Sequence, residues 1–354
     1  MSLYDDIHTF IASNRHDDEV FNSLACRVFA HQYETIPLVA ALAKRAGKKP
    51  EAITHWSEVP ALPASAFKAT QLFGGTRIRQ TFQSSGTSGA TKSQSAFSDE
   101  GLSLMGESVR ANASRYLFPE GRTTRILVLA PSPEFAPQMI MAWGMAELIR
   151  VFGLDGSRFL IDAKGLDPAE VLGELRAAAS EGVPVTLIGA SFGFVHLLDG
   201  MREAGLRIQC APGSRTMDAG GYKGRSRELS RGELDSAIME SLGVPSSRAI
   251  NLLGMTELAS QFYDGVLRLG SSELRRKENA PWTATRVLAP ESLEPVNRGE
   301  RGLLMHVDLA NLERPAFVRT DDIGVADEHG FEVLGRAQGT DSRGCSLSVE
   351  ELVR

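Results

Sequence analysis

Short apolar runs alternate with stretches of helical apolar spacing between residues 125 and 242, and this alternation constrains the fold more than any other sequence feature. Apolar runs of a few residues are typical of buried strands, whereas apolar side chains three or four positions apart are typical of helices. The predicted strands are Arg125–Ala130, Phe159–Ile161, Val183–Gly189 and Leu206–Cys210, and the predicted helices are Gln138–Phe152, Pro168–Ser180, Phe192–Ala204 and one from the capping pair Ser230 and Glu233 to Leu242. The alternation predicts a parallel sheet with helices on both faces.

The segments on either side of this region have different patterns. Helical spacing before it predicts helices over Asp5–Ala12, Asp18–Ala46 and Asp99–Leu117, with a mostly irregular stretch over Pro50–Thr70, which holds three prolines. After about residue 260, strands are predicted over Gly265–Leu269, Thr285–Leu288, Gly302–Leu309 and Phe331–Leu334. The sequence therefore predicts an α/β fold with a large parallel-sheet domain and a smaller antiparallel β lobe.

We expect four regions along the chain. These are a helical region with a phosphate-binding loop (1–120), a parallel-sheet subdomain (121–260), a β-rich lobe (261–335) and a short tail (336–354).

Composition excludes several functional classes. The 354 residues are 42% hydrophobic and 23% charged with a net charge of -6, which is ordinary for a globular protein and argues against a nucleic-acid partner. The densest basic run, Arg275–Lys277, is expected to be a solvated face. No apolar stretch is long enough to predict a membrane span, and the N-terminus does not resemble a secretory signal. Three cysteines without CxxC spacing predict free thiols and a cytoplasmic location.

The segment Thr81–Lys92 is the strongest candidate for binding a ligand. Gly86 and Gly89 permit a close approach of the backbone. The backbone amides could bind an anion together with the hydroxyl groups of Ser84, Ser85, Thr87 and Ser88. Lys92 adds a positive charge, so the loop suits a polyphosphate. It is not a Walker A loop, because Thr91 stands where that motif has glycine. The alternative is a flexible linker, but we expect this loop to lie between an extended run and a helix.

Two further segments carry polar side chains suited to a nucleotide. In Asn251–Leu258 a helix could begin at Thr256, and Glu257 would then offer an oxygen ligand to Mg2+ held by a triphosphate. In Val318–Gly324, Asp322 could accept both hydroxyl hydrogens of a ribose. Arg336, a short distance further along the chain, could bind the same sugar or a phosphate. The alternatives are an ordinary capped helix start and a polar turn between strands.

Taken in order, the three segments resemble those of the adenylate-forming superfamily, which includes acyl-CoA ligases, luciferases and adenylation domains of peptide synthetases. Gly254–Glu257 is similar to its Tyr-Gly-x-Thr-Glu segment, with Leu253 replacing the tyrosine, and Arg319–Asp322 is similar to its Arg-Thr-Gly-Asp segment. Met217–Tyr222 falls where the superfamily has an adenine-binding loop. The resemblance implies ATP and Mg2+ as cofactors, with Lys92 and Glu257 as catalytic residues and Glu257 as the metal ligand. It implies ATP contacts at Ser84, Ser85, Gly86, Thr87, Ser88, Gly89, Lys92, Gly220, Gly221, Met255, Thr256, Asp322 and Arg336.

From about residue 60 onwards the chain resembles one subfamily, the acyl-protein synthetases of the fatty acid reductase complex in bacterial bioluminescence. Gln83–Gly89 and Arg343–Leu347 carry this resemblance. It implies that a fatty acid is activated as an acyl-adenylate, that Cys345 accepts the acyl group, and that an acyl reductase or carrier protein is the partner. The superfamily's C-terminal lid is expected to be essentially absent, so its lysine has no counterpart here.

The other two cysteines, Cys26 and Cys210, are expected to lie in the core. Two alternatives to self-acylation remain open: a ligase that uses coenzyme A or a carrier protein, and a non-catalytic acyl- or nucleotide-binding subunit.

Overall fold

The computed structural model describes residues 2–84, 91–163, 165–222, 224 and 226–337. The chain forms two compact units, and each draws on separate segments. Unit 1 takes its described residues from Met1–Ala111, Met255–Gln261 and Glu278–Arg354, and unit 2 takes its described residues from Asn112–Gly254 and Phe262–Lys277. The four regions expected from the sequence stay a prediction. Each of those regions is one continuous stretch, whereas each unit combines several separate stretches of the chain.

Unit 1 opens with three helices, α1 (Leu3–Ser13), α2 (Asp18–Thr35) and α3 (Pro37–Arg45). The predicted helix Asp18–Ala46 is therefore two helices. Pro37 is the first residue of α3, a position that tolerates proline because its missing amide would have no partner in the helix. Short elements follow, namely η1 (Pro50–Ala52), η2 (Trp56–Glu58) and α4 (Ala66–Ala69), so the expected irregular stretch is mostly irregular. The longer helix α5 spans Asp99–Tyr116.

The main sheet of unit 1 has five strands in the order β1-β13-β12-β11, with β14 also paired to β13. Its strands are β1 (Leu62–Pro63), β11 (Thr283–Leu288), β12 (Gly302–Asp308), β13 (Phe317–Asp327) and β14 (Gly330–Arg336). All pairings are antiparallel except that of β1 with β13. Strands β2 (Gln80–Gln83) and β3 (Gln94–Phe97) form a separate antiparallel hairpin. The predicted antiparallel lobe is therefore present.

Unit 2 is built on a seven-stranded sheet in the order β10-β9-β8-β7-β4-β5-β6. Its central strands are parallel: β4 (Arg125–Pro131), β5 (Arg158–Asp162), β7 (Val185–Ala190), β8 (Arg215–Ala219) and β9 (Ala249–Leu253). The short edge strands β6 (Gly165–Leu166) and β10 (Phe262–Tyr263) are antiparallel. This confirms the predicted α/β class with a parallel sheet.

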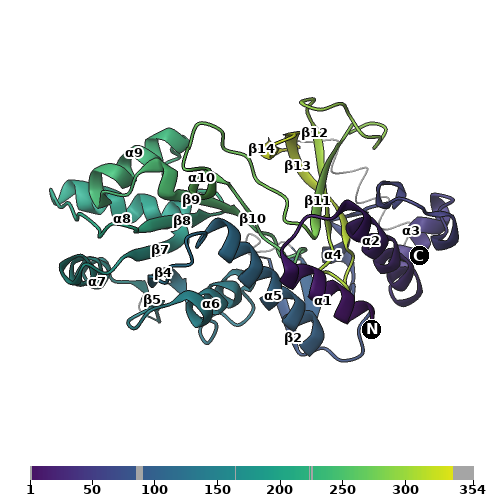
Figure 1. Cartoon of the computed structure of the whole chain (residues 1–354), viewed down its shortest axis with the longest axis horizontal. Coiled ribbons are helices and arrows are strands. Elements are labelled where there is room, and N and C mark those ends of the chain that lie inside the picture. The colour runs from purple at the N-terminus through teal and green to yellow at the C-terminus, as the bar shows by residue number, and fades with distance from the viewer. Residues whose placement is uncertain (1, 85–90, 164, 223, 225, 338–354) are drawn as a thin grey trace. The chain divides into compact units, whose positions relative to one another are not determined.

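Helices cover both faces of this sheet. They are α6 (Ile140–Phe152), α7 (Pro168–Glu181), α8 (Ser191–Glu203) and α9 (Arg231–Leu242). Figure 1 shows α8 and α9 along one face of the sheet and α6 along the other. A shared core joins α7, α8 and α9 to alternate residues of β4 and β7; among its members are Leu127, Leu129, Leu175, Leu187, Phe194 and Ile238. Burial of each such leucine or phenylalanine contributes about 1.5–3 kcal/mol. Ser230 and Glu233 form the predicted capping box of α9.

Two predicted strands are wrong. Leu206–Cys210 is not a strand; the amides of Ile208 and Cys210 donate instead to Ser241 and Leu242 at the end of α9. The strand at that place in the sheet is β8. It contains the buried polar residues Arg215 and Asp218, so it does not read as an apolar run in the sequence. The second wrong strand is Gly265–Leu269. Its residues Val266–Leu269 form the short helix α10, which ends at Gly270 in the left-handed region (φ 67°).

No helix among the described residues is long and apolar enough to cross a membrane.

Candidate functional site

The predicted phosphate loop is the tip of the β2–β3 hairpin. The Ser84 amide donates to the Ser93 carbonyl at 2.9 Å, and the Ser93 amide donates to the Ser84 hydroxyl oxygen at 3.0 Å, so these two residues close the neck of the loop. Lys92 is exposed beside that neck. Ser85, Gly86, Thr87, Ser88 and Gly89 lie outside the described residues.

The expected helix after this loop is wrong, because the strand β3 follows it first. A tight antiparallel neck fixes both ends of the loop, and a flexible linker between domains has no such neck. The chain between Ser84 and Ser93 therefore joins two strands of one hairpin in unit 1 and is not a linker between domains, and its role in binding a ligand stays a prediction.

The segment of Met255, Thr256 and Glu257 belongs to unit 1 and has no regular secondary structure. Thr256 and Glu257 form a turn, so the helix predicted to begin at Thr256 is absent. The Asn311 side chain accepts from the Ala259 amide (3.0 Å) and donates to the Glu257 carbonyl (2.8 Å), which satisfies backbone groups that a helix would have paired. Tertiary hydrogen bonds replace the expected helical ones here.

The Glu257 side chain is half-buried. Its carboxylate forms no hydrogen bond or ion pair with another residue that the structure describes, so its oxygens are available to a cation. Within the described ranges, no group of three or more His, Cys, Asp and Glu side chains could hold a metal ion by itself. This donor set fits Mg2+, which keeps several waters and is bound through one or two carboxylates together with substrate phosphates.

Asp322 and Arg336, predicted to bind the ribose, are cross-strand neighbours on β13 and β14. The Arg336 Nε donates to Asp322 Oδ1 at 3.2 Å, and the Arg336 side chain is 83% exposed against 14% for Asp322. Burial raises the pKa of the Asp322 carboxyl, although Arg336 acts in the opposite direction. The pair therefore presents one acceptor and one donor on the same side of the sheet, which suits a hydroxyl-rich ligand.

In unit 2, the predicted adenine loop begins where β8 ends. Gly220 adopts a positive φ of 72°, which favours glycine, and both Gly220 and Gly221 are exposed. The Ser191 hydroxyl, at the start of α8, lies 2.8 Å from the Gly220 carbonyl and 2.9 Å from Asp218 Oδ2. The loop thus lies beyond the carboxyl end of a parallel strand, where ligands bind in such sheets.

A polar network that the sequence did not predict supports this loop. Asn251 Nδ2 donates to Asp218 Oδ2 at 2.9 Å, and Lys277 Nζ donates to the Asn251 carbonyl (2.7 Å) and Oδ1 (2.6 Å). Burial lowers the pKa of Lys277 to about 8, partly opposed by Asp264 and Asp218. Arg231 pairs with Asp218, so among the described residues this carboxylate has three side-chain partners, Ser191, Asn251 and Arg231.

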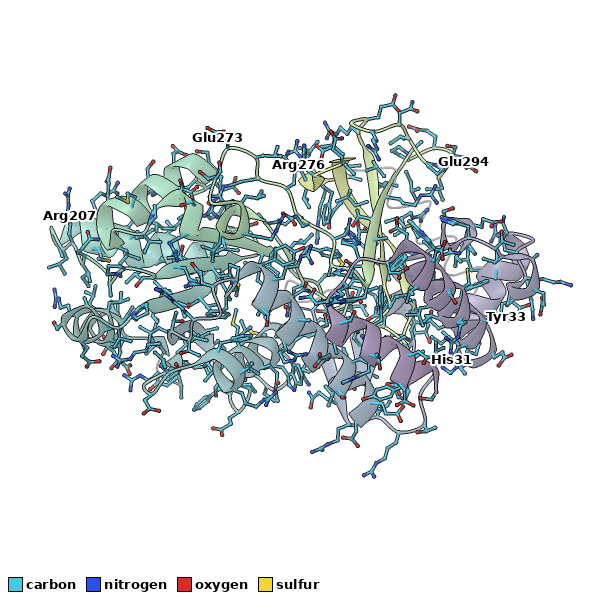
Figure 2. All side chains as sticks on the ribbon, in the orientation of Figure 1. His31, Tyr33, Arg207, Glu273, Arg276 and Glu294 are labelled. Carbon is cyan, nitrogen blue, oxygen red and sulfur yellow. The ribbon has the colours of Figure 1, made fainter. Side chains whose placement is uncertain are left out.

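The expectation that Arg275–Lys277 forms a solvated face is therefore wrong for two of its residues. Arg275 forms ion pairs with Asp235 and Asp264, both at 2.7 Å, and Lys277 bonds Asn251. Arg276 lies on the connection between α10 and β11 (Figure 2). The run of charges could not by itself predict this network, because its partners lie outside the run.

Of the two cysteines that the structure describes, Cys210 lies in the core as expected, whereas the expectation that Cys26 does so is wrong. Cys210 is buried, which raises the pKa of its thiol to about 11. Cys26 is half-buried on α2, and burial with the nearby Glu58 raises the pKa of its thiol. A raised pKa disfavours the thiolate, which is the reactive form of a cysteine. Cys345 lies outside the described residues.

Comparison with known proteins gives concordant matches. Residues 3–353 match the acyl-protein synthetase family LuxE. The chain is 26% identical over 311 residues to the long-chain-fatty-acid–luciferin-component ligase of Aliivibrio fischeri, covering 84% of this chain and 79% of that protein. The ligase of the same name from Vibrio harveyi is 24% identical over 315 residues, covering 85% and 80% of the two chains.

Solved structures of adenylate-forming ligases share the fold. A 2-hydroxyisobutyryl-CoA ligase in complex with 2-HIB-AMP and CoA gives a TM-score of 0.63 at 15% identity, covering 90% of this chain and 69% of that chain. ATP-bound MatB from Rhodopseudomonas palustris gives a TM-score of 0.53 at 16% identity. The match covers 73% of this chain and 48% of that chain, so this chain spans about half the length of that protein.

Proposed function

Since the chain belongs to the LuxE family of acyl-protein synthetases, we propose that it activates a long-chain fatty acid with ATP and transfers the acyl group to its own Cys345. The family match over residues 3–353 carries this proposal. The fatty acid is the substrate class named for the relatives in Aliivibrio fischeri and Vibrio harveyi. An acyl reductase or carrier protein would then receive the acyl group.

The residues described above supply the parts of an ATP site. The hairpin loop from Ser84 to Lys92 binds the phosphates through backbone amides, hydroxyl groups and the lysine charge. Asp322 accepts hydrogen bonds from the ribose, with Arg336 beside it. Gly220 and Gly221 are the proposed adenine contacts, and Met255 and Thr256 are further proposed ATP contacts. These assignments rest on the resemblance.

Glu257 would hold Mg2+, which supplies charge neutralisation at the phosphates. The reaction needs little proton transfer. A carboxylate oxygen of the fatty acid attacks the α-phosphorus, the bond to the bridging oxygen of pyrophosphate breaks, and acyl-adenylate forms. Catalysis then depends on in-line positioning and on neutralising the phosphate charge, which the loop amides and Lys92 provide.

The second step transfers the acyl group. The Cys345 thiolate attacks the acyl carbonyl, the bond between this carbon and the phosphate oxygen breaks, and AMP leaves with a thioester on the protein. The acyl acceptor must be a thiolate, and the environments of Cys26 and Cys210 disfavour that form. A thiol on the same chain also has a high effective concentration at the adenylate.

A ligase that uses coenzyme A is the second candidate, because one structural neighbour is a CoA ligase solved with CoA. The two candidates share the first step and differ in the acceptor. A purely binding subunit would perform neither step.

The test combines acid-dependent ATP–pyrophosphate exchange with intact-mass analysis. We expect exchange with long-chain fatty acids and an acyl adduct on the protein that hydroxylamine removes. Cys345→Ser should keep the exchange and lose the adduct, whereas the matched control Cys26→Ser should keep both. An adduct retained in Cys345→Ser would exclude Cys345 as the acceptor, and exchange without any adduct in the parent protein would favour the CoA ligase. No exchange with any acid would support the binding subunit.

A further inference from the structure

The segment Met255–Gln261 crosses from one unit to the other and back. The chain immediately before it and after it belongs to unit 2, but the segment belongs to unit 1. It contains no helix and no strand, so its backbone hydrogen bonds are not supplied by regular structure. The backbone groups of this segment therefore need partners outside regular secondary structure.

The Asn311 side chain, between β12 and β13, forms hydrogen bonds with two residues of this segment. Its Nδ2 donates to the carbonyls of Glu257 (2.8 Å) and Pro315 (3.0 Å). Its Oδ1 accepts from the Ala259 amide (3.0 Å) and from the Arg314 guanidinium. An asparagine amide offers two donors and two acceptor positions, and all four are used here. The flanking donors and acceptors fix which end of the amide faces which partner.

Asp308, at the end of β12, holds the next residue of the segment. Its carboxylate accepts from both the Ser260 amide and the Ser260 hydroxyl, each at 2.7 Å. The Trp282 indole donates to the same hydroxyl at 2.9 Å. Asp308, Ser260 and Trp282 are all buried, so the interaction is shielded from water. Asn311 and Asp308 together contact three residues in the segment, Glu257, Ala259 and Ser260.

We propose that Asn311 and Asp308 are positioning residues for adenylation, which fix the turn at Glu257 so that its carboxylate meets the ATP-bound cation. This inference rests on the proposed function, because it assigns a role relative to Glu257. Neither side chain touches the substrate in this account. Both act through the backbone of the segment, and misplacing a group that contacts the substrate by about 1 Å can cost about 100-fold in rate.

Asn311→Asp is a suitable variant because it preserves the size of the side chain. It replaces Nδ2 with an oxygen that faces the carbonyl oxygens of Glu257 and Pro315, so both donated bonds are lost. Asp308→Asn similarly replaces one acceptor oxygen with an amide that cannot accept from Ser260. Asn22→Asp is the matched control in the same unit. Asn22 accepts from the Trp56 amide (2.8 Å) and donates to the Thr54 carbonyl (3.0 Å), in a segment away from Glu257.

A double-mutant cycle with Glu257→Gln separates positioning from general stability. We expect Asn311→Asp to lower the rate of acid-dependent ATP–pyrophosphate exchange at least about tenfold and to raise the Mg2+ concentration needed for half-maximal rate. In the Glu257→Gln background the same change should cost less than about twofold, because residues that act through one group are non-additive. Asp308→Asn should show the same pattern, and Asn22→Asp should leave the rate and Mg2+ dependence unchanged.

Each other outcome decides against the proposal. If the rate loss in the double variant equals the product of the two single losses, Asn311 acts independently of Glu257. That result would overturn the positioning role of Asn311 and leave the proposed function standing. A failure of both Asn311→Asp and Asp308→Asn to fold would show that the pair maintains unit 1 as a whole. No exchange in the parent protein would refute the proposed function, and full activity of Glu257→Gln would refute the role of that carboxylate; either result removes the inference with it.

Discussion

His306 makes the stability of unit 1 sensitive to acid. It lies on β12 with its side chain fully buried, and its Nδ1 is 2.9 Å from the Thr285 hydroxyl. Its ring lies 5.1 Å from that of Phe331. Burial in these surroundings lowers the pKa of His306 from 6.5 to about 3, so the imidazole stays neutral in the folded protein.

The direction of the effect follows from proton binding. Between pH 6.5 and pH 3 the unfolded chain protonates this histidine and the folded chain does not, so the free energy of unfolding falls as the pH falls. Each pKa unit corresponds to about 1.4 kcal/mol, so the loss between pH 7 and pH 5 is about 2 kcal/mol. Its full extent, approached near pH 3, is about 5 kcal/mol.

The assay is urea unfolding at pH 7, 6 and 5, followed by tryptophan fluorescence. A Trp143→Phe background removes the tryptophan of unit 2, so the signal reports Trp56 and Trp282 of unit 1. His306→Gln removes the titrating group and keeps polar atoms near Thr285, and it should lose about 2 kcal/mol less than its parent over this pH range. His329→Gln is the control, because that side chain is 57% exposed. Equal pH dependence in the parent and His306→Gln would refute the reasoning.

Two further predictions concern ATP binding. Replacing Gly86 with valine should block the close approach of the loop backbone to a phosphate and abolish thermal stabilisation by Mg-ATP; unchanged ATP affinity would contradict the assignment of this loop. Replacing Lys277 with methionine removes both hydrogen bonds to Asn251, which holds Asp218 below the adenine loop, and we expect calorimetry to show about tenfold weaker ATP binding. Unchanged binding in Lys277→Met would mean that the network supports the sheet without affecting the loop.

Much of the fold could be predicted because local patterns decide it. The strands β4 and β7 are short apolar runs, and the helix α9 starts at a capping box that is visible in the sequence. The pattern failed at β8, where the buried Arg215 and Asp218 are tolerated only because they find partners. Arg215 bonds the Leu117 carbonyl and Glu120, and Asp218 bonds Ser191, Asn251 and Arg231. Most of these partners are far along the chain, so no single window of sequence contains the whole compensation.

The candidate site divides in the same way. Asp322 and Arg336 were singled out from motif residues, and the structure brings the two side chains together on neighbouring strands, while their role at a ribose stays a prediction. The conformation at Glu257 was predicted wrongly, because a capped helix start and a turn fixed by distant side chains have similar local sequences. The bond that decides between them joins Asn311 to a carbonyl 54 positions earlier. Local propensity is a weak guide when tertiary bonds satisfy the backbone.

At two of the irregular segments with candidate ATP contacts, an asparagine that is not itself a predicted contact bonds the segment or a residue next to it. Asn251 and Lys277 secure Asp218 beside the loop of Gly220, and Asn311 secures the carbonyl of Glu257. An irregular backbone allows Gly220 or Glu257 to face a ligand, because helices and strands would commit their amides and carbonyls to each other. The freed backbone groups then need partners from side chains, and an amide side chain is suited to this because it donates and accepts at once. We therefore expect a change at Asn251 or Asn311 to alter adenylation while every residue predicted to touch ATP stays the same.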